Sequence, residues 1–297
     1  MTVIEKGPRQ LMIRGVTDFD PAQIFESGQC FRWTRLDSGG YRGIAGRRAL
    51  TVRSGKPGSG ILELSGATEE EFEGFWRHYL DLDRDYREIR ARLSALDPVM
   101  QQAVKHGQGL KILRQEFWET LVSFILSANN NVSRIAAIVE RLARTLGSPV
   151  PGADEGHTFP EAGWLASAGR EDVSLCRCGY RLGYIMEAAE RVSRGWIRET
   201  ELRTLSSEEA RSQLMQIPGV GAKVADCVLI YSCISMDVFP VDVWVKRAME
   251  NLYFGRPACM KEITAFAKAR FGELSGFAQM YLFHYARKNQ LRDVTIA

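Results

Sequence analysis

The segment IPGVGAKVADC, residues 217–227, decides the fold. Pro218 fixes one backbone angle, and Gly219 and Gly221 allow the left-handed angles of a tight turn. Helix-forming sequence lies on both sides, so the segment predicts a hairpin between two helices. Backbone N–H groups at the start of the second helix favour an anion, and the glycines let a phosphate backbone approach closely. The pattern predicts a helix–hairpin–helix that binds DNA, with an ordinary turn between helices as the alternative.

Lys223 lies in the first turn of the second predicted helix. A lysine is ordinarily protonated at neutral pH and is then not a nucleophile. The positive end of the helix dipole and apolar neighbours favour the neutral amine, which can attack an electrophilic carbon. Contact with a DNA phosphate is the alternative role that the residues leave open.

A second segment, FPVDVWVKR at residues 239–247, follows the hairpin. Asp242 directly precedes a helical run and is expected to cap that helix. A capping aspartate at the mouth of a pocket can also stabilise positive charge on a sugar, and the two roles are compatible.

Composition bounds the class of protein. The chain has 297 residues and is 45% hydrophobic, enough for one large domain or two smaller ones. Its formal net charge of +3 permits nucleic-acid binding without requiring it. The first residues lack an apolar run of signal-peptide length, and no run approaches membrane-spanning length, so a soluble intracellular protein is expected.

The cysteines and histidines do not show the spacing of a metal site. The six cysteines form no CxxC pair and no four-cysteine set of the kind that holds an iron–sulfur cluster. The four histidines form no HExxH pair. We therefore expect no catalytic metal and mostly reduced structural thiols, with Cys30 and Cys227 as possible pocket residues.

Two parts of the chain differ in pattern. Short strand-like runs broken by Gly, Ser and Pro fill much of the first hundred residues, with SGKPGSG at 54–60 as a connecting loop and Thr68 at a helix start. From about Asp97 the pattern is helical. We predict an α+β protein, with a small antiparallel-sheet domain at 1–98 and an all-helical domain at 99–297 that contains the helix–hairpin–helix.

Within the helical part, the run 116–147 is interrupted at Asn129–Asn131, where two helices should meet because asparagine favours turns and caps. Further helices are expected at 161–169, 170–177, 180–195, 207–216, 222–235, 242–253, 258–270 and 275–289.

Together, these segments resemble the 8-oxoguanine DNA glycosylase/AP lyase family of the helix–hairpin–helix DNA glycosylase superfamily. The hairpin with Lys223 and the later Asp242 are similar to the superfamily. Four further segments narrow the resemblance, and they occur in the family's order across nearly the whole chain: SGQCFRW at 27–33, SANNNVSRI at 127–135, GYRLGY at 179–184 and GFAQMYLFHYAR at 276–287. The resemblance implies a TATA-binding-protein-like sheet domain followed by a helical body.

The resemblance also implies the chemistry. Lys223 would attack C1′ of the damaged nucleoside and expel the base, leaving a Schiff base from which β-elimination nicks the strand. Asp242 would stabilise the oxocarbenium-like charge and help to position the lysine.

Base recognition by resemblance depends on a flipped-out nucleotide. 8-Oxoguanine carries a hydrogen on N7 where guanine has an acceptor, and the carbonyl of Gly28 would bond that hydrogen and repel guanine. Phe283 and Cys227 would sandwich the base, and Gln279 would bond its Watson–Crick edge. Phe124 is assigned to the same base-recognition group.

On the opposite strand, Asn129 would fill the space that the base vacates, and Tyr180 would wedge beside the orphaned cytosine. Arg134 and Arg181 would donate hydrogen bonds to that cytosine, with phosphate or solvent contact as the alternative for both.

The remaining implied contacts are with the DNA backbone, at Gly219, Gly221 and Trp244. No cofactor is required. A structural cation at the hairpin is a further possibility, held by carbonyls that match Met215, Ile217 and Val220.

This sequence departs from the eukaryotic pattern at two positions. Trp244 stands where the eukaryotic members have a phosphate-contacting histidine, and Gly183 stands where they have a second arginine. The expected partner is double-stranded DNA containing 8-oxoguanine, with no membrane, and the expected state is a monomer. The chain lacks a basic tail, which favours the cytoplasm of a prokaryote, where it would associate with the nucleoid through DNA.

Two other functions remain open at this point. A glycosylase for alkylated bases usually lacks the lysine, and adenine-excising relatives commonly carry an iron–sulfur cluster, so Lys223 and the cysteine pattern argue against both. A non-catalytic helix–hairpin–helix module that only grips phosphates is the third reading.

Overall fold

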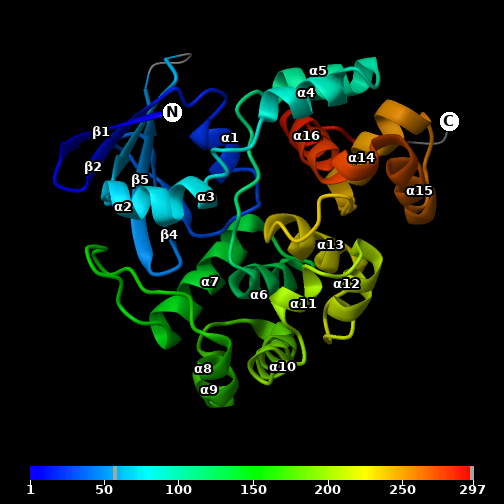
Figure 1. The fold of residues 1–297 in the computed structure, drawn as a ribbon. Coiled ribbons are helices and arrows are strands. Elements are labelled where there is room, and N and C mark those ends of the chain that lie inside the picture. The colour runs from blue at the N-terminus through cyan, green and yellow to red at the C-terminus, as the bar shows by residue number, and fades with distance from the viewer. Residues whose placement is uncertain (56–58, 295–297) are drawn as a thin grey trace.

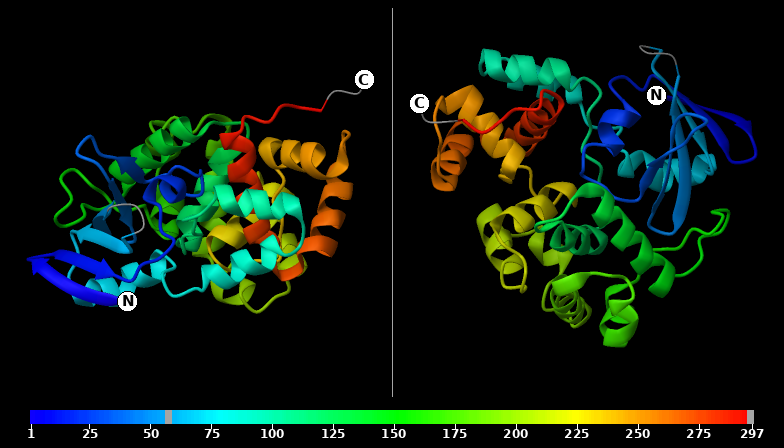
Figure 2. Two further views of the ribbon diagram at one scale, coloured as in Figure 1. Left: turned by 90° about the horizontal axis from the view of Figure 1, so that it is seen from above. Right: turned by 180° about the vertical axis from the view of Figure 1, so that it is seen from behind.

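The computed structural model describes residues 1–55 and 59–294, and it confirms the α+β prediction (Figure 1). An antiparallel sheet from the first part of the chain lies at one side, and a body of helices makes up the rest. Figure 2 shows the same division from above and from behind.

The sheet has strand order β1-β2-β6-β5-β4-β3, and every neighbouring pair is antiparallel. The predicted loop at 54–60 follows β5, and its residues 56–58 lie outside the described residues. The strands are β1 Thr2–Gly7, β2 Gln10–Arg14, β3 Trp33–Arg35, β4 Tyr41–Ala45, β5 Arg48–Ser54 and β6 Ile61–Ser65.

Alternating side chains of the sheet form one hydrophobic core. Leu50 and Val52 of β5 and Leu62 and Leu64 of β6 are buried, as the two-residue period of a half-covered strand requires. A helical segment at Glu69–Tyr79 covers this face, built from α2 Glu69–Glu71, the π-helix η1 Phe72–Trp76 and α3 Arg77–Tyr79. Thr68 begins it with a capping box, which confirms the helix start expected there.

The helical body consists of two groups of helices. The first group joins α4 and α5 to the last three α-helices, so that segments far apart in sequence lie side by side (Figures 1 and 2). The second group contains the middle of the chain. The helices of the first group are α4 Tyr86–Ser94, α5 Pro98–His106, α14 Val243–Met249, α15 Met260–Phe271 and α16 Ser275–Lys288. The helices of the second group are α6 Phe117–Ser127, α7 Val132–Leu146, α8 Ala162–Ser167, α9 Arg170–Ser174, α10 Leu182–Ser193, α11 Glu199–Leu202, α12 Ser207–Leu214 and α13 Ala222–Tyr231.

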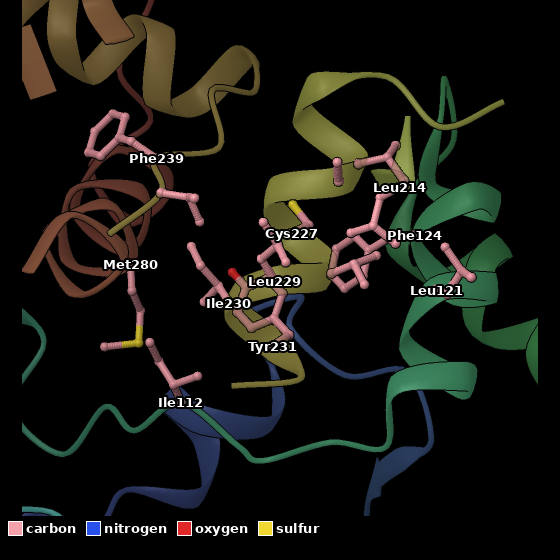
Figure 3. Packing of buried hydrophobic residues seen from close by; sticks show 14 of the residues in the cluster. Ile112, Leu121, Phe124, Leu214, Cys227, Leu229, Ile230, Tyr231, Phe239 and Met280 are labelled. Atoms are coloured by element: carbon pink, nitrogen blue, oxygen red, sulfur yellow. The ribbon is translucent and has the colours of Figure 1, made fainter. Parts of the chain in front are cut away.

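Helix α13, which follows the hairpin, lies at the centre of the body. Its residues 224–231 are all buried, including the charged Asp226. Figure 3 shows side chains from α6, α12 and α16 packed around it, among them Phe124, Leu214 and Met280. The helix that carries Lys223 is therefore held on all sides by core packing.

Several helices end at other residues than predicted, because the backbone there enters the left-handed region. The helix expected at 170–177 ends at Ser174, and Arg177 has φ +59°. The next helix begins as a short 3₁₀ turn, η2 Gly179–Arg181, before α10. The helix expected at 222–235 ends at Tyr231, near Cys233 with φ +50°. These left-handed residues are neither Gly nor Asn, so composition did not reveal the stops.

Three further differences come from short or irregular segments. The helix expected at 242–253 divides into α14 and the π-helix η3 Glu250–Phe254. The helices α1 Pro21–Phe25 and α11 were not predicted, because one turn is too short to show a helical period. The break at Asn129–Asn131 is confirmed, with Asn131 capping α7.

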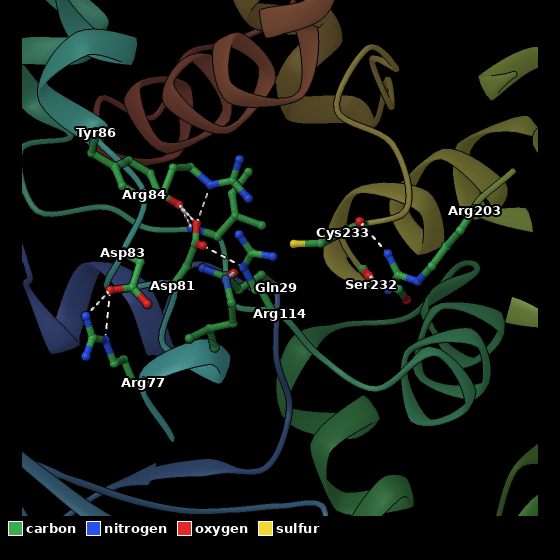
Figure 4. Close-up of polar contacts among 12 residues, drawn as sticks. Gln29, Arg77, Asp81, Asp83, Arg84, Tyr86, Arg114, Arg203, Ser232 and Cys233 are labelled. Atoms are coloured by element: carbon green, nitrogen blue, oxygen red, sulfur yellow. Dashed lines mark hydrogen bonds and ion pairs between the residues drawn. The ribbon is translucent and has the colours of Figure 1, made fainter. Parts of the chain in front are cut away.

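The two hydrophobic cores divide between Leu82 and Tyr86, and Leu113 returns to the sheet core. The boundary predicted at residue 98 stays a prediction, although α4 already packs in the helical core. A buried carboxylate lies at the division. Asp81 accepts hydrogen bonds from Arg84 at 2.6 Å, Arg114 at 2.7 Å and Tyr86 at 2.8 Å (Figure 4).

In the part of the chain that the structure describes, the helices are all too short or too polar to cross a membrane.

Candidate active site

A cavity of about 1050 Å³ opens where the sheet domain and the two helix groups meet. Its walls bring together residues that lie far apart in sequence, from the loop after α1, the α6–α7 turn, the start of α13, the start of α14 and the middle of α16. Of the predicted site residues, the cavity is lined by Gly28, Phe124, Asn129, Lys223, Asp242, Trp244 and Phe283.

Lys223 enters this cavity from the first turn of α13. Its Nζ donates a hydrogen bond to Ser127 Oγ at 3.2 Å and lies 5.2 Å from the centre of the Phe124 ring. The side chain is half-buried, so the amine is not free in bulk water. A single hydroxyl partner leaves the amine positioned and available for another group.

Asp242 lines the same cavity and caps α14, as predicted. Its Oδ1 accepts a hydrogen bond from Val245 N at 2.8 Å. Burial raises the pKa of the Asp242 carboxyl, whereas the N–H groups of Val245 and Trp244 and the charges of Lys223 and Arg287 lower it. The lysine and the aspartate line one cavity and form no ion pair within 4.0 Å.

The aromatic side chains of Phe31 and Phe124 form the inner wall. Phe124 stacks on Tyr231 with ring centres 5.2 Å apart and meets Phe31 edge-on at 5.8 Å. Cys227 lies one turn beyond Lys223, is buried, and does not itself line the cavity. Burial raises the pKa of its thiol to about 11, partly opposed by Lys223, so the thiol stays neutral.

The outer wall joins Gly28 to α16. Gly28 has φ +85°, a conformation that favours glycine, in the loop between α1 and β3. Phe283 is half-buried at the cavity, and Arg287 lies over its ring at 5.7 Å and donates to the carbonyl of Glu26 at 3.2 Å. This contact connects the Gly28 loop to α16.

Gln279 lies one turn before Phe283 on α16 and is buried, away from the cavity lining. Its Oε1 has no hydrogen-bond partner among the residues that the structure describes. An unsatisfied buried amide oxygen costs about 1–3 kcal/mol, so this atom is suited to accept from a ligand donor.

The α6–α7 turn and η2 form the rim. Asn129 is exposed and has φ +48°, and Arg134 is exposed on α7. Tyr180 is 61% exposed, and its hydroxyl donates to the carbonyl of Ala128 at 3.3 Å.

Arg181 has a different position from the one expected for a base-contacting arginine. It is buried, and its guanidinium donates to the carbonyls of Ala128 at 2.9 Å and Asn129 at 2.9 Å. In this structure it holds the Asn129 turn, and contact with a cytosine requires those bonds to be exchanged.

The hairpin lies against α10, near the start of that helix. Gly219 has φ +86°, and the ring of Tyr184 packs where a side chain at 219 would lie. Gly221 is exposed and directly precedes α13 at its N-cap position. Among the predicted carbonyl donors, Ile217 O accepts the turn hydrogen bond from Val220 N at 3.0 Å, and Met215 is exposed.

Three residues of the site were missed by the sequence reasoning, namely Ser127, Phe31 and Arg287. Each lies inside one of the motif segments already quoted, two to four residues from a predicted site residue. Their proximity in sequence was the available signal. The residues that the structure describes contain no group of three or more His, Cys, Asp or Glu that could hold a metal ion.

The fold and the cavity define a DNA glycosylase of the helix–hairpin–helix class. Residues 122–272 match the family model for the HhH-GPD superfamily base excision DNA repair protein, and residues 12–121 match the 8-oxoguanine DNA glycosylase N-terminal domain.

Two solved structures are similar to this chain over nearly its full length. The chain is 44% identical to MBOgg1, solved in complex with a low-affinity DNA ligand, with TM-score 0.91 over 97% of this chain and 99% of that one. It is 36% identical to the Clostridium acetobutylicum 8-oxoguanine glycosylase/lyase, solved with double-stranded DNA containing cytosine opposite 8-oxoG, with TM-score 0.92 over 98% and 99%.

Among curated proteins, the chain is 30% identical over 221 residues to the probable N-glycosylase/DNA lyase of Methanothermobacter thermautotrophicus, covering 66% of this chain and 70% of that protein. The 3-methyladenine DNA-glycosylase from Archaeoglobus fulgidus, at 21% identity and TM-score 0.72, shares the fold. The chain belongs to the 8-oxoguanine DNA glycosylase/AP lyase family, as its sequence motifs predicted.

Proposed function

We propose that this protein excises 8-oxoguanine paired with cytosine from double-stranded DNA and then nicks the strand. The observation that carries the proposal is that Lys223 and Asp242 face one cavity together with Gly28 and Phe283. Two supporting facts are the hydroxyl partner of the amine, Ser127, and the similarity to a glycosylase/lyase over 98% of the chain.

The proposed chemistry begins with the amine of Lys223 as the nucleophile. As the bond from C1′ to N9 breaks, its electrons leave with the base and Nζ bonds to C1′; the amine gives up one proton and the base takes up one, so the protons balance. Asp242 lies close enough to act on the amine electrostatically and stabilises positive charge on the sugar. Ring opening gives a Schiff base, loss of a C2′ proton breaks the C3′–O3′ bond, and water releases the lysine.

In the proposed recognition, the base leaves the helix and enters the cavity against Phe283, and it reaches Cys227, buried behind the lining, once the pocket opens. The Gly28 carbonyl accepts the N7 hydrogen that guanine lacks. The free Oε1 of Gln279 accepts from the Watson–Crick edge of the base, which explains why a buried amide oxygen lacks a protein partner. Phe124 closes the inner wall.

The rim would hold the opposite strand. Asn129 fills the vacated space, and the exposed Tyr180 is suited to wedge beside the cytosine. Arg134 donates to that cytosine directly, whereas Arg181 does so after releasing the Ala128 and Asn129 carbonyls.

The hairpin would bind the DNA backbone through Gly219 and Gly221, with Trp244 near the lesion phosphate. A structural cation held by the carbonyls of Met215, Ile217 and Val220 is part of the proposal, because a cation there can bridge to a phosphate. We also propose that the protein acts as a monomer in a prokaryotic cytoplasm; its similarity to the Clostridium acetobutylicum and Methanothermobacter thermautotrophicus proteins supports the prokaryotic source.

Covalent trapping tests the proposal. Borohydride reduces a Schiff base, so the native protein should become linked to duplex DNA with one 8-oxoguanine opposite cytosine. Lys223→Gln should bind the duplex with similar affinity and yield neither linkage nor strand cutting. Lys246→Gln is the matched control: this lysine also lines the cavity but is paired with Glu250 at 2.9 Å, so trapping should persist at saturating enzyme.

The other outcomes identify the alternatives. Native protein that binds but never traps contradicts the proposed mechanism. If Lys223→Gln weakens binding and the native protein cuts no strand, the protein is a non-catalytic helix–hairpin–helix module that binds DNA phosphates. Excision confined to other single-lesion duplexes in a panel would reassign the substrate.

A further inference from the structure

One buried amide lies directly behind the proposed base-recognition carbonyl. Gln29 follows Gly28 and is 2% exposed. Its Nε2 donates to Lys111 O at 2.9 Å, to Ser27 Oγ at 3.1 Å and to Ile24 O at 3.2 Å, and its Oε1 accepts from Leu113 N at 2.8 Å. The side chain therefore connects the end of α1 to the segment 111–113.

The backbone of Gln29 is fixed as well. Its carbonyl accepts a hydrogen bond from Gln115 Nε2 at 2.7 Å. Gln29 thus bonds the same segment through its side chain and its main chain, and Figure 4 shows it beside Arg114 at the division between the two cores.

This arrangement bears on Gly28 because the Gly28 carbonyl and the Gln29 N–H belong to one planar peptide unit. A glycine with φ +85° has wide conformational freedom and cannot fix the direction of its own carbonyl. Gln29, the next residue, can fix the direction of the Gly28 carbonyl, provided that Gln29 is itself immobile.

The segment that holds Gln29 is itself anchored. Ile112 N donates to Tyr86 Oη at 2.8 Å, Lys111 Nζ lies 4.1 Å from the Tyr86 ring centre, and Arg114 N donates to Tyr79 O at 2.9 Å. The Gly28 loop is therefore held in place by residues at the junction of the sheet domain and the helical body.

We propose that Gln29 is a positioning residue that aims the Gly28 carbonyl into the cavity, so that selectivity for 8-oxoguanine over guanine depends on this buried amide. The inference rests on the proposed function. The Gln29 side chain would control selectivity while touching neither the base nor the sugar.

The test measures binding in the Lys223→Gln background, with duplexes carrying 8-oxoguanine, guanine or an abasic-site analogue opposite cytosine. Adding Gln29→Leu should reduce the preference for 8-oxoguanine over guanine about tenfold, the scale of one buried hydrogen bond. Affinity for the abasic duplex should stay unchanged, because no base is read there.

Gln23→Leu is the matched control. Gln23 also joins α1 to the chain just before the segment 111–113, through Gln108 O at 2.9 Å, but it is not adjacent to Gly28. This variant should keep the full preference for 8-oxoguanine.

A milder variant covers the case in which Gln29→Leu does not fold. Gln115→Leu removes only the bond to the Gln29 carbonyl, and it should lower the preference about threefold. An unchanged preference in the folded variants, or an equal loss of affinity for all three duplexes, overturns the inference. A parent protein that shows no preference at all instead refutes the proposed function itself.

Discussion

At the scale of single residues, Asp242 combines two tasks that substitutions can separate. Its Oδ1 caps α14 through Val245 N, and its charge acts on Lys223. Asp242→Asn keeps an acceptor for the cap, so the free energy of unfolding should change by less than about 0.5 kcal/mol. The single-turnover excision rate should fall about 100-fold, because the charge that stabilises the sugar is lost.

Asp242→Ala is the companion variant. It removes the cap as well and should cost about 1 kcal/mol of stability in urea unfolding, with a similar loss of rate. An asparagine variant that excises at the native rate would contradict the electrostatic role.

The same carboxyl predicts the acidic limb of the pH profile. Burial raises the pKa of Asp242 above its ordinary value of 3.8. The folded protein therefore binds this proton more tightly than the unfolded chain, so this group's contribution to stability is greatest at low pH and is lost as pH rises through the raised pKa. Activity has the opposite sign, because the ionised form is required.

Excision by the native protein should accordingly decline with acid at a pH above 3.8, while the fold gains this small contribution. Single-turnover rates against pH measure the decline. The limb should be absent from Asp242→Asn, and its persistence there would assign the titration to another group.

At the scale of elements, the hairpin depends on one close contact. A Cβ at Gly219 would lie 2.4 Å from Tyr184 Cδ2, at φ +86°. Gly219→Ala should therefore lower the free energy of unfolding by about 1–3 kcal/mol and weaken binding to abasic duplex. Thermal or urea unfolding, with a binding titration, checks both effects.

Gly183→Ala provides the contrast, since Gly183 lies in α10 with no atom within 4 Å of an added Cβ. Alanine favours a helix over glycine by about 0.5–1 kcal/mol, so this variant should be slightly more stable. Equal destabilisation in both would show that the Tyr184 contact is not responsible.

Element by element, local chemistry was predictable and tertiary partners were not. The caps at Thr68 and Asp242 follow from one residue type before a helical run, and both are present. Arg181 was assigned to the DNA by the family resemblance, yet it is buried and donates to two carbonyls of the α6–α7 turn. Likewise, no local pattern shows that Ser127 meets Lys223, since the residues are 96 positions apart.

At the scale of the whole molecule, one buried carboxylate lies at the division between the cores. Asp81 is 1% exposed and bonds Arg84 and Arg114, whereas Asp83 nearby is 59% exposed and pairs with Arg77 (Figure 4). Asp81→Asn should cost about 2–3 kcal/mol of unfolding free energy, less than a fully buried pair because the arginines are partly exposed. Asp83→Asn should stay within about 0.5 kcal/mol.

Urea unfolding of the two variants measures the difference. Similar midpoints for both would mean that solvent screens Asp81 as well, and that the junction is held by hydrophobic packing instead.

The contact between the Gly28 loop and α16 also bears on how the protein is made. Residues near the start of the chain supply one wall of the cavity, and Phe283 and Arg287 supply the facing wall. Synthesis proceeds from the first wall to the last, so a growing chain carries its hairpin and its lysine before the final helix has left the ribosome. A copy that ends before α16 would lack the wall that Phe283 and Arg287 supply, so the cavity is complete only after this helix has been made.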